Sequence, residues 1–245
     1  MKKIFTKAFL GVCALGTSVV AIAQDAAAPV VEESFHQALK IKFIEGSADF
    51  MSTIAIALIL GLAFALERII YLNLADTNAD KLLKGIEAAL DKGDVEAAKA
   101  IARDTRGPIA SIAYQGLMRI DQGIDIVEKS IVSYGGVQGG LLEKNLSWIT
   151  LFIAMSPSLG FLGTVVGMVM AFDKIEQVGD ISPTVVAGGM KVALITTIGG
   201  LIAALILQVF YNYLLSKLES ILNKMEDASI TLLDIVIKYD VKYKK

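Results

Sequence analysis

The chain has 245 residues, of which 55% are hydrophobic and 20% charged, and its net charge is −2. Soluble globular domains average about 45–50% apolar and about 25% charged residues, so the apolar excess indicates the concentrated runs of a membrane protein. The near-neutral charge does not favour nucleic-acid binding, and a single histidine, His36, and a single cysteine, Cys13, exclude a zinc site of Cys/His type and an intrachain disulfide.

The first 23 residues have the features of a secretory signal peptide. Three lysines precede an apolar run over 8–23, and the run ends in an A-x-A site with cleavage expected before Gln24. The alternative is an uncleaved transmembrane helix, for which this run is short. Val12 before Cys13 does not fit a lipoprotein signal. We therefore predict a signal peptide over 1–23.

The segment 24–47 is predicted to be periplasmic. Within it, Phe35, Leu39 and Phe43 recur at a spacing of four residues, which is typical of a short amphipathic helix. Such a helix either lies on the membrane surface or serves as a solvated tether.

Three apolar runs are long enough to cross a membrane, since about 20 helical residues span the hydrocarbon core. We predict spanning helices over 48–73, 147–172 and 185–215. The first has bulky apolar residues on every side and is expected to face lipid. The second contains Pro157, which a membrane helix tolerates when its neighbours satisfy the freed carbonyl group, and the third has Lys191 in its first turns.

The distribution of basic residues predicts the orientation of the spans. Residues 75–145 carry nine Lys or Arg and 216–245 carry six, whereas the connection 173–183 carries one. Because positively charged loops stay in the cytoplasm, we predict a periplasmic N-terminus and a short periplasmic loop over 173–184. The same rule predicts a cytoplasmic helical region over 74–146 and a cytoplasmic tail over 216–245.

The region 74–146 is helical by pattern. A cap is expected at residues 76–78, a turn at 91–94, and a further helix start at Pro108. A long helix is expected from about Asp125, with Glu128 completing a capping box, and it is expected to continue into the second span.

Small residues form one face on each of the second and third predicted spans. In the second span this face consists of Pro157, Gly160, Thr164, Gly167 and Ala171, widened by Gly163. In the third span it consists of Gly189, Ala193, Thr197, Gly200 and Ala204, with Thr196 beside it.

These faces have two readings. In one, the small residues let helices pack closely and the threonine hydroxyls bond to their own backbone carbonyls. In the other, Thr164 and Thr197 occupy similar depths and line an inner surface that a partner helix enters. The uncharged parts of both spans contain no Asp, Glu or His, so the titrating carboxylate of any proton pathway is expected on another chain.

Two segments of the sequence resemble the MotA/TolQ/ExbB proton-channel proteins. One runs from Leu142 to Met168 and includes Ser156-Pro157-Ser158 and Gly163-Thr164-Val165-Val166-Gly167, and the other is Ala193-Leu194-Ile195-Thr196-Thr197-Ile198-Gly199-Gly200-Leu201. The similarity extends over about 50–213 with the same three-span topology.

The resemblance implies an all-α membrane protein with long cytoplasmic helical extensions that forms a homopentamer in the bacterial inner membrane. It implies a channel and motor subunit rather than an enzyme, with no cofactor and no metal. The pentamer would surround single-span partners of ExbD/TolR type that carry the membrane aspartate, and proton flow would drive a TonB/TolA-type protein in outer-membrane transport.

The resemblance also assigns residues. Thr164 and Thr197, with Thr196 beside them, match the pore-lining threonines. The resemblance assigns the packing of helices around the pore to seven small residues on the two spans: Pro157, Gly160, Gly163, Gly167, Ala193, Gly200 and Ala204. Glu67 and Arg68 are a candidate pair at the inner membrane boundary, within or between subunits, or else a solvated boundary.

The sequence departs from the family pattern at Val192, where a glutamate is frequent. The N-terminal extension favours an ExbB-like protein. A TolQ-like envelope-integrity motor, a structural membrane ring of a motility or secretion machine, and sodium in place of protons remain alternatives.

Overall fold

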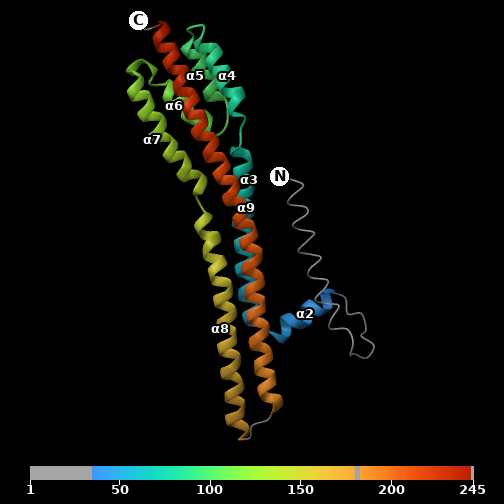
Figure 1. Cartoon of the computed structure of the whole chain (residues 1–245). Helices are drawn as coiled ribbons and strands as arrows, with labels where there is room; N and C mark the ends of the chain where they lie inside the picture. The colour runs from blue at the N-terminus through green and yellow to red at the C-terminus, as the bar shows by residue number, and fades with distance from the viewer. Residues whose placement is uncertain (1–34, 180–182, 244–245) are drawn as a thin grey trace, which may run out of the picture. The chain divides into compact units, whose positions relative to one another are not determined.

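A computed structural model describes residues 35–179 and 183–243, and within these ranges all regular elements are helices (Figure 1). The predicted signal peptide lies outside the described residues. The chain divides into two units, 1–44 and 45–245, and the described part of the first belongs to one helix. In chain order the helices are α2 (Phe35–Glu45), α3 (Ala48–Ala75), α4 (Ala79–Leu90), α5 (Val95–Asp104), α6 (Pro108–Leu117), the 3₁₀ turn η1 (Ile120–Gln122), α7 (Ile124–Glu143), α8 (Leu146–Val178) and α9 (Pro183–Tyr243).

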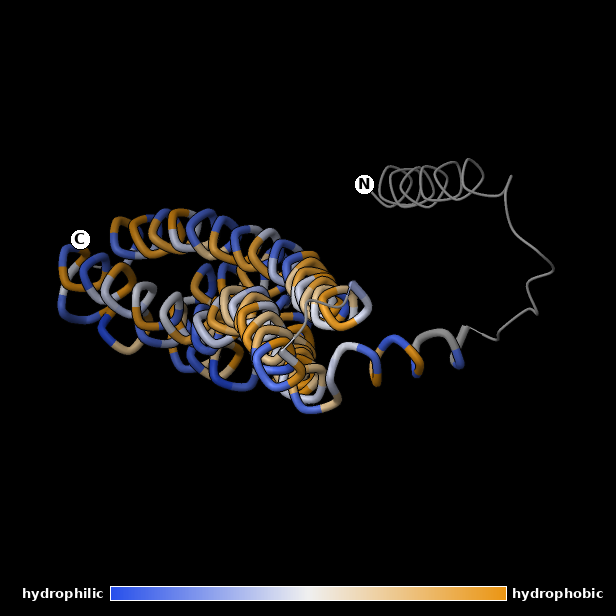
Figure 2. The backbone as a smooth tube through the Cα atoms, turned by 90° about the horizontal axis from the view of Figure 1, so that it is seen from below, coloured by the Kyte–Doolittle hydropathy of each residue, from blue (hydrophilic) through white to orange (hydrophobic). Residues whose placement is uncertain are grey.

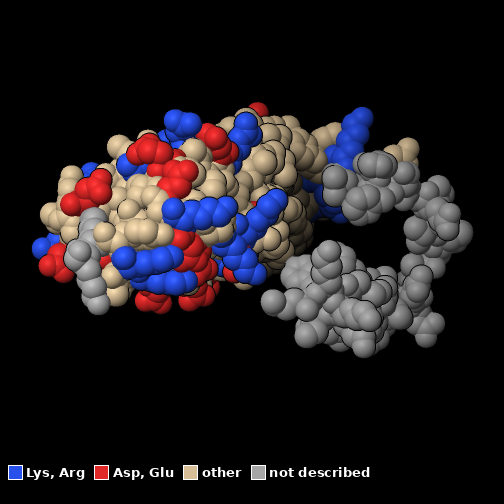
Figure 3. All heavy atoms as spheres, turned by 90° about the horizontal axis from the view of Figure 1, so that it is seen from above, with Lys and Arg blue, Asp and Glu red and all other residues tan. Residues whose placement is uncertain are grey.

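Three stretches are long and apolar enough to cross a membrane, and they lie in α3, in α7–α8 and in α9. Figure 2 shows the apolar residues predominating where α3, α8 and α9 run together, whereas polar residues increase toward the C-terminal end. In Figure 3, which looks onto that end, acidic and basic side chains are interspersed. The predicted all-α membrane fold is confirmed.

Helix α3 packs one face against α8 and α9 and does not face lipid on every side. Its buried residues recur every three or four positions: Ile54, Ala57, Gly61, Ala65, Arg68, Leu72 and Ala75. A Cβ at Gly61 would lie 2.7 Å from Leu207 Cδ1, so a leucine from α9 fills the notch that this glycine leaves. The expectation that α3 faces lipid on every side was therefore wrong, because one face of the helix, which contains small residues, packs against α8 and α9.

Helix α9 continues without interruption through the predicted third span and the predicted tail. At about 1.5 Å per residue its 61 residues extend roughly 90 Å, about three times the hydrocarbon thickness. Beyond the apolar stretch its buried residues alternate at spacings of four and three, the pattern of a helix packed along a seam: Leu214, Leu218, Ile221, Met225, Ala228, Leu232 and Ile235. This seam packs with buried residues of α4, α6 and α7 in one apolar core.

The expected helix starts at α4, α5 and α6 are confirmed. The Asn78 side chain accepts a hydrogen bond from the Lys81 N–H, and Asp94 accepts one from Ala97, so both residues act as N-caps. Pro108 occupies the first position of α6, where its missing N–H costs nothing.

The junction between α7 and α8 differs from the expectation of one continuous helix. Lys144 adopts an extended conformation, and Asn145 is left-handed with φ 67°, so the helix stops at Glu143 and restarts at Leu146. Asparagine tolerates this conformation better than most residues. The expected Asp125 capping box is also wrong, because α7 starts after Gly123 without any side-chain cap.

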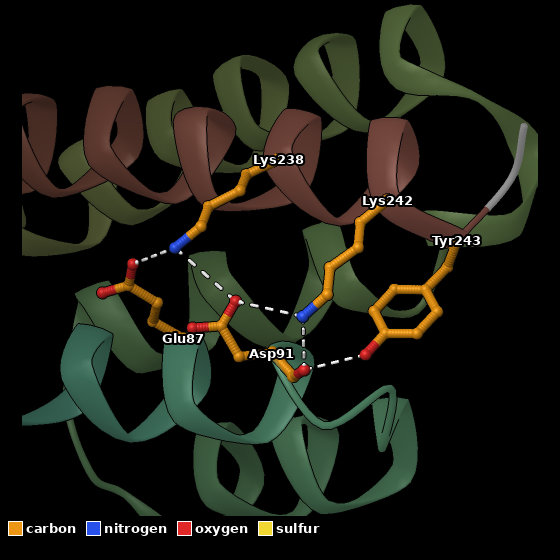
Figure 4. A network of polar contacts seen from close by, with 5 residues as sticks. All are labelled: Glu87, Asp91, Lys238, Lys242 and Tyr243. Carbon is orange, nitrogen blue, oxygen red and sulfur yellow. Dashed lines mark hydrogen bonds and ion pairs between the residues drawn. The ribbon is translucent and has the colours of Figure 1, made fainter.

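The C-terminal end of α9 is fastened to the end of α4 by polar contacts (Figure 4). Lys238 Nζ lies 3.0 Å from Glu87 and 3.5 Å from Asp91. Lys242 and Tyr243 donate hydrogen bonds of 2.7 and 2.8 Å to the Asp91 carbonyl oxygen. These donors satisfy a carbonyl group at the C-terminus of α4 that has no partner within the helix, so they fix the α4–α5 hairpin to α9.

Asp76, which follows α3, binds two lysines of α9. Its carboxylate accepts hydrogen bonds from Lys217 at 2.5 Å and Lys224 at 2.6 Å. These two ammonium groups lower the pKa of Asp76 below its ordinary value of 3.8. A carboxyl group with a lowered pKa in the folded state adds stability above its unfolded-state pKa and loses it as pH falls through the folded-state pKa.

We expect Asp76→Asn to lower the free energy of unfolding by about 1–2 kcal/mol at neutral pH. The deficit should shrink as pH falls below 3.8 and vanish below the folded-state pKa, where the native Asp76 is also neutral. The difference in the free energy of unfolding between the native chain and Asp76→Asn is measured from unfolding curves in detergent across this pH range. Asp227→Asn, on the exposed side of α9, is the control. A deficit that stays constant down to the lowest pH would contradict the ion pairs as its source.

Candidate functional site

The small faces of α8 and α9 pack directly against each other within the chain. A Cβ at Gly160 would lie 2.8 Å from the Thr196 carbonyl oxygen, and one at Gly200 would lie 2.5 Å from the Ser156 carbonyl oxygen. Backbone therefore meets backbone, which is possible only where side chains are absent. The two glycines thus set the distance between the helices.

The contact continues along both helices. Gly163 lies against the Thr196 side chain, Gly167 lies against the backbone of Ala193, and Gly189 lies against Ala171. Ala193 is buried, whereas Pro157 and Ala204 are half-buried at the edges of the contact. The residues that the sequence assigned to packing around a pore thus belong to, or border, the α8–α9 contact of one subunit.

Thr164 of α8 and Thr197 of α9 meet at one edge of this contact, where both are half-buried. Their hydroxyl groups form a short hydrogen bond in which either oxygen can donate. Thr164 also donates to the Ala193 carbonyl at 3.1 Å, across the helix contact. The expectation that these two threonines lie at similar depth is confirmed.

The Ala193 carbonyl oxygen is shared by three hydroxyl groups, those of Thr164, Thr196 and Thr197, at 2.9–3.2 Å. A carbonyl oxygen has two lone pairs, so only two hydroxyls can donate to it at once. The third must use another acceptor, such as the Gly160 carbonyl at 3.3 Å from Thr164 or the Val192 carbonyl at 3.2 Å from Thr196. The cluster therefore has several arrangements of its hydroxyl protons and leaves a threonine oxygen free to accept.

Thr196 differs from the other two threonines. It is fully buried, with its side chain against Gly163 and its hydroxyl bonded to backbone carbonyls of its own helix. Thr164 and Thr197 are the members of the cluster that reach the surface of the helix pair.

A cleft of about 440 Å³ lies between the second half of α8 and the first turns of α9. Gly167 and Val192 line it, and Gly167 lies one helical turn from Thr164. Lys174 provides a charge in its wall. Val192, at the position where a glutamate is frequent in the family, contributes only apolar surface, and the neighbouring Lys191 forms a 2.6 Å ion pair with Glu45.

Glu67 and Arg68 form an ion pair within the subunit. Arg68 is buried, and it donates to both carboxylate oxygens of Glu67 at 2.6 and 2.7 Å. The guanidinium also lies 4.5 Å from the centre of the Tyr71 ring and donates to the Leu141 carbonyl at 3.5 Å. Asn145 donates to Glu67 at 3.4 Å, so the pair contacts both sides of the α7–α8 break.

No group of three or more His, Cys, Asp or Glu side chains in the described ranges is placed to hold a metal ion. The fold and the hydroxyl cluster define a helical membrane protein with a polar pair between two tightly packed spans. Residues 104–227, slightly more than half of the chain, match the model of the MotA/TolQ/ExbB proton channel family, and the chain belongs to this family.

Curated relatives have names in the same family. A putative biopolymer transport protein ExbB homolog of Methanothermobacter thermautotrophicus is 29% identical over 69% of this chain and 60% of its own length. Biopolymer transport protein exbB1 of Vibrio cholerae is 36% identical over 33% of this chain, and ExbB of Aquifex aeolicus is 33% identical over 32%. The matches span 39–60% of the relatives' lengths.

Proposed function

We propose that this chain is the channel and motor subunit of an ExbB-type complex rather than an enzyme. With a single-span partner of ExbD/TolR type it converts proton motive force into mechanical work on a TonB/TolA-type protein for outer-membrane transport. The observation that carries the proposal is the half-buried Thr164–Thr197 pair, whose hydroxyls are bonded to each other and have alternative acceptors.

The chemistry of the pair defines what the partner must supply. A hydroxyl can donate to a carboxylate or accept from a carboxylic acid, but it does not titrate at physiological pH. The uncharged parts of the second and third predicted spans contain no Asp, Glu or His, so the proton must be stored elsewhere. A membrane aspartate on a partner helix meets this requirement. The Thr164 and Thr197 hydroxyls can form a hydrogen bond with this aspartate in either of its protonation states.

The proposal includes an assembly and an orientation. Five copies surround the partner helices, with the Thr164–Thr197 edge of each copy turned inward. Nine basic residues over 75–145 against one over 173–183 favour α4–α7 in the cytoplasm of a bacterial inner-membrane protein and the N-terminus in the periplasm. Thr196 is then a packing residue that holds Gly163 and the Ala193 carbonyl in place.

Replacing both Thr164 and Thr197 by valine is expected to abolish energy-dependent uptake in cells that carry the partner proteins. Valine keeps the shape of threonine but removes the hydroxyl, so membrane levels and assembly should stay normal. The Thr164→Ser/Thr197→Ser double variant is the matched control, and it should retain most of the uptake. Full uptake by the valine variant would exclude the hydroxyl pair from the pathway.

A further inference from the structure

A second cleft, of about 380 Å³, lies where the end of α3 meets the start of α6 and the side of α7. Tyr71 and Leu74 line it from α3, Arg106 and Ser111 from the α6 side, and Gln138 and Leu142 from α7. No aspartate or glutamate belongs to its lining. The cleft is therefore apolar on one side and cationic on the other.

Two polar side chains of the cleft are not used by the fold, whereas Ser111 donates a hydrogen bond to the Gly107 carbonyl oxygen at 3.1 Å. Arg106 is exposed, and it forms no hydrogen bond or ion pair with the described residues. The half-buried Gln138 amide likewise has no hydrogen-bond partner there. The nearby Asp104 is paired with Arg103 at 3.3 Å. The cleft thus presents an uncompensated guanidinium and an amide to a ligand.

The cleft lies beside the predicted inner end of the first span, 48–73. The uncharged run of α3 ends at Leu66, and Tyr71 and Leu74 follow within about two helical turns. Ile70 and Leu74 are 61% and 71% exposed, so the apolar outer face of α3 continues to the mouth of the cleft. A tyrosine at such a boundary is typical of the interfacial belt of membrane proteins.

We propose that this cleft binds one glycerophospholipid, with Arg106 and Gln138 donating to the headgroup phosphate and the acyl chains lying along the exposed face of α3. Arginine matches two phosphate oxygens with its planar fork of donors, and no acidic side chain in the cleft repels the anion. The continuity with the membrane-facing side of α3 favours a lipid over a soluble phosphate. The assignment to the inner leaflet rests on the proposed orientation.

Native mass spectrometry of the full chain in detergent, titrated with phosphatidylglycerol, tests the site. We expect Arg106→Gln to weaken the tightest binding by roughly five- to tenfold. Lys92→Gln is the control for the loss of one positive charge, since Lys92 is exposed and does not line the cleft, and it should bind like the native chain. Because Arg106 has no partner in the described fold, its substitution should leave thermal unfolding without lipid unchanged.

Three results would overturn the proposal. If Arg106→Gln binds phosphatidylglycerol as tightly as the native chain does, the Arg106 guanidinium does not bind the lipid. Binding of glycerol 3-phosphate as tight as that of the lipid would make this a soluble phosphate site. A changed oligomeric mass without a change in lipid binding would assign the cleft to a second copy of the chain. None of these results alters the threonine test, which concerns a different edge of the molecule.

Discussion

Alanine at Gly200 is expected to lower the free energy of unfolding by about 2–3 kcal/mol, because overpacking a tight contact displaces whole helices. The new Cβ would lie 2.5 Å from the Ser156 carbonyl oxygen, a backbone atom that cannot rotate away. Helices α8 and α9 must then separate. The separation also breaks the bond between Thr164 and Thr197, so we expect activity to fall further than stability alone predicts.

Gly188→Ala is the matched control for this substitution. Gly188 lies on the same helix, but a Cβ there meets nothing within 4 Å. Since alanine favours a helix by about 1 kcal/mol over glycine, this variant should be neutral or slightly more stable. Thermal unfolding in detergent, together with energy-dependent uptake, measures both variants. Equal stability of Gly200→Ala and the native chain would show that the helices are not held apart by backbone contact.

The sequence pattern predicted a face of small residues on α8 and on α9, because small residues at helical spacing are typical of close helix packing in membranes. The pattern assigned these faces to packing around a pore and did not predict that they pack against each other within one subunit. The caps at Asn78 and Asp94 were predictable, since these residues satisfy backbone N–H groups within their own helix turn. Such features depend on residues that are near one another in the chain.

The packing face of α3 was not predicted, because its small residues are separated by bulky ones that dominate the composition. The pattern Ala57, Gly61, Ala65 is visible only when one asks which side lacks large side chains. The break at Asn145 was missed for a different reason. Nothing in the local sequence interrupts the apolar periodicity there, and the break is supported by contacts from Glu67 of α3.

The hydroxyl cluster around the Ala193 carbonyl was also only partly predictable from the sequence. Sequence reasoning placed Thr164 and Thr197 at a common depth, but not the single carbonyl oxygen that three hydroxyls share. That arrangement depends on how closely Gly160 and Gly200 let the helices approach, which is a property of the packed pair. The orientation of Thr196 toward Gly163 follows from the same approach.

The ion pair of Glu67 and Arg68 gives the second large effect, and it is expected to be asymmetric. The Arg68 side chain is 5% exposed, whereas that of Glu67 is 47% exposed. Glu67→Ala leaves a buried guanidinium with one long hydrogen bond and the Tyr71 ring, which should cost about 3–5 kcal/mol. Arg68→Met removes the buried charge, fills similar space, and leaves the Glu67 carboxylate on the exposed side of α3, so we expect a loss of less than about 2 kcal/mol.

The adjacent pair Arg103–Asp104 is the control, because it has the same sequence spacing but is 67% and 72% exposed. Arg103→Ala should change the free energy of unfolding by less than about 0.5 kcal/mol. Unfolding measurements on the three variants rank the effects. If Arg68→Met is as damaging as Glu67→Ala, the positive charge itself is required, and the guanidinium is then assigned to holding the α7–α8 junction through the Leu141 carbonyl rather than to neutralising Glu67.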